Sequence, residues 1–162
     1  MVVGRVRPAL QSRRHWRAGL VGGTLVGLIL AYGVWGQPAS PRPSGPALAA
    51  AVVWLGVVYG AVDALLLTVV PVLSVYGSRP TELLRSGRER ARWGGLALLA
   101  SMVVAGAYHV GFPEFQGPTL VQPLIGNAIV TAGYLLTGSP LAAVLAHVII
   151  HIAAAFQGME GT

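Results

Sequence analysis

The chain has 162 residues, of which 54% are hydrophobic and only 10% are charged, and its mean hydropathy is +0.68. Soluble domains carry about a quarter charged residues, so this composition excludes an ordinary soluble protein and predicts a membrane protein. Cysteine is absent, which excludes disulfides and thiolate chemistry. The net charge of +6 comes from arginines in two short clusters, a distribution that is typical of a membrane protein's topology rather than of a nucleic-acid partner.

The first two predicted spans follow a basic head. An α-helix needs about 20 mostly apolar residues to cross the bilayer. Residues 1–17 contain five arginines, and a first transmembrane helix is expected over residues 18–36, ending at the loop QPASPRPSGP. A second span is expected over residues 47–76, where Pro71 can kink the last turns.

Three further spans are expected over residues 93–110, 119–136 and 139–156. The second arginine cluster precedes them, GFPEFQGP and TGSP separate them, and Ser139 before Pro140 is typical of a helix start with an N-cap. Both arginine clusters are expected on the cytoplasmic side, with the N-terminus inside and the C-terminus outside. The sequence therefore predicts an all-α, multi-pass bundle of about five spans in the cell membrane, with residues 47–157 as a four-helix core after the first transmembrane helix.

Two features of the first span have alternative interpretations. SRRHW before a hydrophobic run resembles a twin-arginine signal, but the run is long and no convincing small-x-small cleavage site follows it, so a retained helix is the preferred interpretation. Gly19, Gly23 and Gly27 form a stripe that lets another helix approach closely. We expect this stripe to pack within the chain rather than to form a dimer.

Ionisable residues inside the spans are the candidates for function. Asp63 is the one acidic residue in a span, since Glu82, Glu89, Glu114 and Glu160 lie in loops or the tail. A charge at mid-bilayer costs about 3 kcal/mol or more unless it is paired, which makes Asp63 a functional hypothesis.

Histidines show the same bias toward the spans. His109 lies near the end of the third span, while His147 and His151 lie four residues apart on one face of the fifth. That spacing allows two imidazoles to address one metal ion or substrate group, although a helix–helix hydrogen bond is the alternative. Asn127 in the fourth span is a further polar candidate, with helix–helix hydrogen bonding as its expected role.

Two stretches, SMVVAGAYHVGF and GYLLTGSPLAAVLAHVIIHIAAAF, resemble the CPBP intramembrane protease family, which includes CAAX prenyl endopeptidases and bacteriocin-processing or immunity proteins. The family has Glu-Glu-x-x-x-Arg, Phe-x-x-x-His and His-x-x-x-Asn motifs, the last usually after a Tyr-x-x-Thr-Gly-Ser turn. Residues 134–139 match that turn, His109 matches the second motif and His147 the third. The resemblance covers residues 50–157 and is strongest over 93–157.

The chain departs from the family pattern at several positions. Where the family has its glutamate pair the chain reads Val62-Asp63-Ala64, which leaves one shorter carboxylate, and neither Leu67 nor Thr68 can replace the motif arginine. Ala105 stands where the family has phenylalanine, and His151 replaces the last asparagine. The first motif is therefore degenerate.

The resemblance implies an intramembrane endopeptidase that hydrolyses a peptide bond of a membrane-associated peptide or protein. Asp63 would be the general base or a metal ligand, His109 would help to hold the water, and His147 and His151 would be metal ligands or oxyanion donors. Together the four side chains would suit a divalent transition metal such as Zn²⁺.

Two alternatives remain open. The degenerate first motif is typical of a catalytically inactive relative that acts as a membrane binding or scaffold subunit. Intramembrane histidine pairs also suit a His-ligated metal or haem protein, and a bound haem would show a visible absorption band.

Overall fold

A computed structural model describes residues 8–77 and 87–158, with side chains from His15 onward, and within these ranges all regular structure is helical. Residues 1–7 of the predicted basic head, part of the second arginine cluster and the tail glutamate lie outside the described residues. The described part of the chain has five helices that are long and apolar enough to cross a membrane, which confirms the predicted fold class. The elements are α1 (Pro8–Trp35), α2 (Pro46–Ala51), the π-helical η1 (Val52–Tyr59), α3 (Gly60–Asp63), the π-helical η2 (Ala64–Val69), α4 (Val70–Gly77), α5 (Gly87–His109), the 3₁₀ turns η4 (Pro113–Phe115) and η5 (Gly117–Leu120), α6 (Val121–Thr137) and α7 (Pro140–Gln157).

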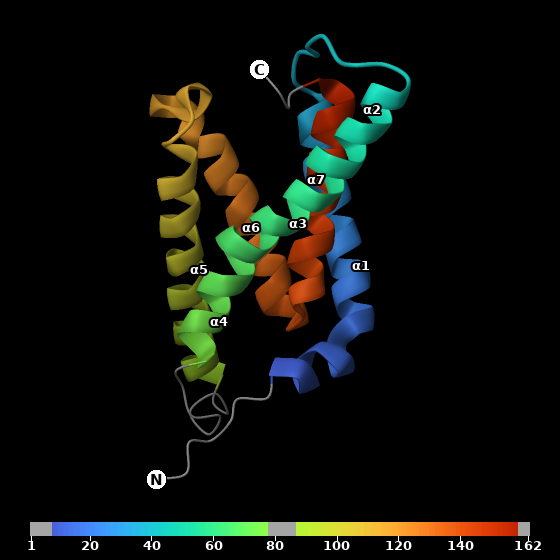
Figure 1. Ribbon diagram of the computed structural model, residues 1–162. Helices are drawn as coiled ribbons and strands as arrows, with labels where there is room; N and C mark the ends of the chain where they lie inside the picture. The colour runs from blue at the N-terminus through green and yellow to red at the C-terminus, as the bar shows by residue number, and fades with distance from the viewer. Residues whose placement is uncertain (1–7, 78–86, 159–162) are drawn as a thin grey trace.

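The second span, from α2 to α4, is one long helix that crosses the bundle diagonally (Figure 1). Its first half, η1 and α3, packs on α7, whereas α4 packs on α5. Helices α1 and α7 lie side by side and share the most extensive interface of the bundle, while α5 lies beside α6. The midpoint of the long helix, at α3, therefore lies between the α1–α7 and α5–α6 pairs.

The start of α1 and the start of α5 lie at the same end of the bundle (Figure 1). Arg17 lies in the first half of α1, and Arg88, Arg90 and Arg92 lie in the first turns of α5. The predicted topology requires this arrangement, because both arginine clusters are assigned to one side of the membrane. That this side is the cytoplasm stays a prediction.

The glycine stripe of α1 packs against α7 of the same chain. A Cβ atom at Gly23 would lie 2.6 Å from the carbonyl oxygen of Ala142, and one at Gly27 would lie 2.9 Å from Ile149. Both distances are shorter than van der Waals contact, so only glycine permits this approach of the two backbones. The expectation that the stripe packs within the chain is confirmed.

Helix α7 begins where α6 ends, at the Thr-Gly-Ser turn. Gly138 ends α6 with a φ of 64°, a left-handed conformation that favours glycine, and its N–H donates to the Tyr134 carbonyl over 2.8 Å. Ser139 is the N-cap residue of α7 as predicted, but its hydroxyl makes no capping bond. The reason is that this buried hydroxyl is turned against Gly19 of α1, and the Ala142 N–H donates to the Ser139 carbonyl instead.

A buried polar network fastens the long helix to α5 and α6. Pro71 has no N–H, so one carbonyl of the preceding turn loses its usual donor. The Ser101 hydroxyl of α5 donates to the Leu67 carbonyl over 2.6 Å, and the Asn127 amide of α6 donates to Ser101 over 2.9 Å. Thr68 in turn donates to the Asn127 side-chain oxygen over 3.1 Å. Burial of these groups is tolerated because each has a partner.

The loop between α1 and α2 closes over the C-terminal end of α7. The Arg42 guanidinium donates to the Phe156 carbonyl, and the Ser40 N–H donates to the Gln157 carbonyl over 3.0 Å. The Gln157 side chain donates back to the Gln37 carbonyl over 2.7 Å. These bonds satisfy carbonyls that a helix end leaves without partners, and the positive charge of Arg42 is favourable there.

Candidate functional site

The centre of the candidate site is a buried ion pair between Asp63 of α3 and His151 of α7. The Asp63 Oδ2 lies 3.3 Å from the His151 Nε2, and the Asp63 side chain is only 7% exposed. A carboxylate this deeply buried needs a partner, because the desolvation of an unpaired charge costs several kcal/mol. The structure therefore brings together two of the four predicted site residues in direct contact.

Gly60 lets α3 approach α7 closely enough for this contact. A Cβ atom at Gly60 would lie 3.1 Å from the Val148 Cα and 3.2 Å from the His151 Cβ. Asp63 follows Gly60 by three residues and therefore lies on the same face of the helix. The short aspartate side chain reaches His151 because the two backbones almost touch one turn earlier.

The local helix geometry around Asp63 is unusual. Asp63 ends a single α-helical turn, Gly60–Asp63, between the π-helical segments Val52–Tyr59 and Ala64–Val69. π-Helical turns are rare and occur frequently at functional sites, where they change the direction of side chains relative to an α-helix. This position is consistent with a functional role for Asp63.

His147 lies beside the ion pair on the next turn of α7. Its ring is stacked on that of His151, with ring centroids 6.4 Å apart and planes inclined by 19°. The His147 Nδ1 lies 3.2 Å from the Ala143 carbonyl oxygen. Because a carbonyl only accepts, Nδ1 carries the hydrogen, and in the neutral ring Nε2 is left as the acceptor.

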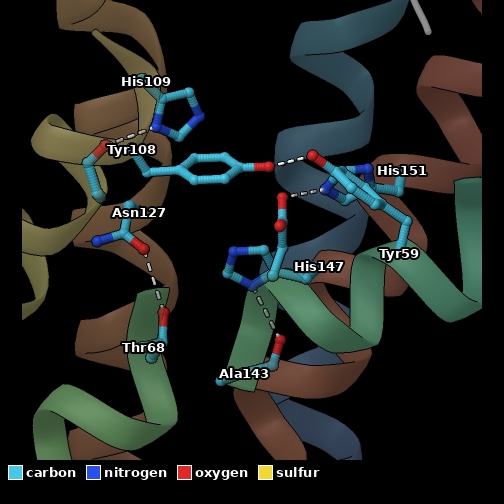
Figure 2. A network of polar contacts seen from close by, with 10 residues as sticks. Tyr59, Thr68, Tyr108, His109, Asn127, Ala143, His147 and His151 are labelled. Atoms are coloured by element: carbon cyan, nitrogen blue, oxygen red, sulfur yellow. Dashed lines mark hydrogen bonds and ion pairs between the residues drawn. The ribbon is translucent and has the colours of Figure 1, made fainter. Parts of the chain in front are cut away.

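His109 is in the same tautomer but is held apart from the ion pair. Its Nδ1 donates to the Ala105 carbonyl over 2.8 Å, and its ring packs edge-on against Phe115 with centroids 5.0 Å apart. Figure 2 shows His109 beside Tyr108 on α5, across from His147 and His151. The structure thus brings Asp63, His147 and His151 together and leaves His109 on the facing helix.

Two tyrosines that the sequence did not indicate complete the cluster. Tyr108 extends from α5 toward the long helix, and its hydroxyl forms a hydrogen bond with that of Tyr59 (Figure 2). The Tyr59 ring packs edge-on against His151 with centroids 5.5 Å apart, and Tyr108 interacts electrostatically with Asp63. One signal was present in the sequence: Tyr59 precedes Asp63 by four residues, so the two share a helix face.

Asn127 belongs to a separate cluster. It is buried and hydrogen-bonded to Thr68 and Ser101, on two other helices. These contacts confirm its expected role in joining helices.

The predicted metal shell is not assembled in this arrangement. Among residues 8–77 and 87–158, no three His, Cys, Asp or Glu side chains are grouped so that they could hold a metal ion. Asp63 and His151 pair with each other, while His109 packs on Phe115. The four donors as placed do not fit a metal ion, so we derive no step through one, and a zinc or other divalent ion stays a prediction.

Five apolar helices around a buried carboxylate–imidazole pair define a multi-pass membrane protein with an intramembrane polar site. The family model for type II CAAX prenyl endopeptidase Rce1-like proteins matches residues 82–153. This match confirms the CPBP resemblance over that part of the chain, which contains the three histidines, whereas Asp63 precedes it. No curated protein and no solved structure matches the chain.

Proposed function

We propose that this protein is a CPBP-type intramembrane hydrolase that cleaves a peptide bond of a membrane-associated peptide or protein. The observation that carries the proposal is the buried Asp63–His151 pair beside His147, whose Nδ1 lies against the Ala143 carbonyl, in a chain whose residues 82–153 match a CAAX endopeptidase family. The cell membrane is the proposed location, with the arginine-rich end of the bundle in the cytoplasm.

In the proposed reaction Asp63 is the general base. Its carboxylate accepts a proton from a water molecule, and the water oxygen attacks the carbonyl carbon of the substrate. As the C–N bond breaks, the same proton passes from Asp63 to the leaving amine nitrogen, so that Asp63 is ionised again. Substrate and water together supply all the atoms of the two products.

The histidines have supporting roles in this reaction. His151 balances the charge of Asp63 and fixes the direction of its carboxylate. His147 and His109 each have an Nε2 that accepts, because Nδ1 donates to the backbone, and an accepting nitrogen can orient the hydrogens of the water. Each of these rings is held in one tautomer by a bond within its own helix.

The aspartate that replaces the family glutamate is a weaker objection to activity once the position of Asp63 in the fold is considered. A carboxylate that is misplaced by about 1 Å can cost a hundredfold in rate. The close approach of α3 to α7 at Gly60 offsets the missing methylene, because it brings Asp63 within 3.3 Å of His151.

One observation favours the alternative of a catalytically inactive binding or scaffold subunit. The positions where the family arginine would fall, Leu67 and Thr68, are fully buried, and Thr68 is hydrogen-bonded to Asn127. A structural network thus occupies the place of the motif arginine. On this alternative, the Asp63–His151 pair would join helices without performing chemistry.

Cleavage assays in proteoliposomes separate the two functions. The substrates are a fluorogenic peptide that ends in a farnesylated Cys-aliphatic-aliphatic-X sequence and the same peptide without the farnesyl group. The wild type should cleave at least one of them, Asp63→Asn and His147→Ala should be inactive but folded, and His15→Ala in the exposed head should retain activity. A wild type without activity, or full activity in Asp63→Asn, would contradict the enzyme and favour the scaffold subunit.

A further inference from the structure

The hydroxyl pair of Tyr59 and Tyr108 lies against the ion pair but has no part in the reaction described above. Tyr59 is the last residue of η1 and Tyr108 is next to last in α5, so the pair joins two spans beside Asp63 and His151. Both tyrosines are half-buried, whereas Asp63 and His147 are buried. The two tyrosines, like His151, are therefore more exposed than the carboxylate that they adjoin.

A count of hydrogens shows what the pair can donate. Two phenol hydroxyls carry two hydrogens, and a hydrogen bond between them uses only one. The second hydrogen needs another acceptor, and Asp63 is the carboxylate that interacts with Tyr108. When Asp63 takes the proton of a water, it becomes a weaker acceptor, and the second hydroxyl hydrogen can turn to a substrate oxygen.

Three imidazole nitrogens of the cluster already have partners. The His151 Nε2 faces the Asp63 carboxylate, and the Nδ1 atoms of His147 and His109 donate to backbone carbonyls. Hydrolysis of a peptide bond nevertheless places a negative charge on the carbonyl oxygen, which needs hydrogen-bond donors for stabilisation. Among the described side chains around Asp63, the tyrosine hydroxyls meet this need.

We propose that the hydroxyl of Tyr108 donates a hydrogen bond to the substrate carbonyl oxygen and stabilises the negative charge that develops on it. This inference rests on the proposed hydrolase function and adds to it one catalytic residue, Tyr108, and one positioning residue, Tyr59. Tyr108 donates to the oxygen, and Tyr59 orients and polarises Tyr108 through the hydroxyl–hydroxyl bond. No bond to either tyrosine is formed or broken in the reaction.

Single hydroxyl deletions test the proposal in the full-length protein. Tyr108→Phe should lower kcat about a hundredfold, as the loss of one oxyanion donor does, with KM changed by less than about twofold. Tyr59→Phe should lower kcat less, and the double variant should be no worse than Tyr108→Phe, because the two hydroxyls act as one unit. Tyr32→Phe is the matched control, since Tyr32 is 79% exposed on α1, and it should behave as the wild type.

The outcomes separate this inference from the proposed function. If the wild type cleaves the peptides and Tyr108→Phe keeps its kcat, the inference is overturned while the hydrolase stands. A loss in Tyr108→Phe that appears only in KM, or together with a lowered thermal midpoint, assigns the hydroxyl to binding or packing and also overturns it. A wild type that cleaves neither peptide overturns both proposals.

Discussion

Gly60→Ala is the substitution that tests most directly how the fold positions Asp63. The added Cβ atom would lie 3.1 Å from the Val148 Cα and 3.2 Å from both the His147 carbonyl oxygen and the His151 Cβ. Ordinary contact begins at 3.4 Å, so α3 and α7 must separate by a few tenths of an ångström. Overpacking of this kind costs about 1–3 kcal/mol of stability.

The same separation should also weaken the reaction. Since a 1 Å misplacement costs about a hundredfold, a shift of a few tenths of an ångström should lower kcat roughly threefold to tenfold. The assay is peptide cleavage in proteoliposomes beside a thermal unfolding curve in detergent. Gly95→Ala is the matched control, because a Cβ atom there meets no neighbour within 4 Å, and it should leave kcat unchanged.

A second variant on the same background tests the geometry independently of stability. Asp63→Glu adds one methylene, about 1.5 Å of reach, and should restore part of the kcat that Gly60→Ala loses, even though the double variant is no more stable. Wild-type kcat in Gly60→Ala, or an equal loss in Gly95→Ala, would refute the reasoning that the close approach of α3 to α7 sets the position of the carboxylate.

Three further predictions concern packing and metal content. Ser101→Ala removes the hydroxyl that donates to the Leu67 carbonyl and accepts from the Asn127 amide, and it should cost about 1–3 kcal/mol, measured by chemical unfolding; Ser74→Ala, which removes an exposed hydroxyl, should cost less. Gly23→Ala should lower the thermal midpoint strongly because of its 2.6 Å approach to a backbone oxygen, whereas Gly33→Ala on the same helix should not, and equal midpoints would contradict the packing of α1 on α7. If the predicted divalent metal is present, elemental mass spectrometry should find it in stoichiometric amount in the wild type and not in a His147→Ala/His151→Ala variant; its absence from both would contradict that prediction.

The sequence predicts the spans and the core of the site for simple physical reasons. Long apolar runs between arginine, proline and glycine clusters define helices in a bilayer, and the structure has all five. Asp63 is conspicuous because an ionisable group in such a run needs a partner, and the four-residue spacing of His147 and His151 places both on one face toward it.

Other features depend on tertiary packing and leave little trace in the sequence. Tyrosines are common near membrane surfaces, so Tyr59 and Tyr108 do not stand out as polar residues in a span. The π-helical segments on either side of Asp63 have no composition of their own. Pro71 shows that a carbonyl of the preceding turn lacks its usual donor, but only the packing of α5 identifies Ser101 as the group that supplies one.

The anchoring of α7 at both ends determines which histidine faces Asp63. Because His147 and His151 are four residues apart, a slide of α7 by about 6 Å along its axis would exchange one imidazole for the other with the same chemistry. At its start α7 is held by the backbone approach of Ala142 to Gly23, and at its end by the bonds from Ser40 and Arg42. The loop before the second span thus helps to fix the axial register of α7, in which His151 rather than His147 is paired with Asp63.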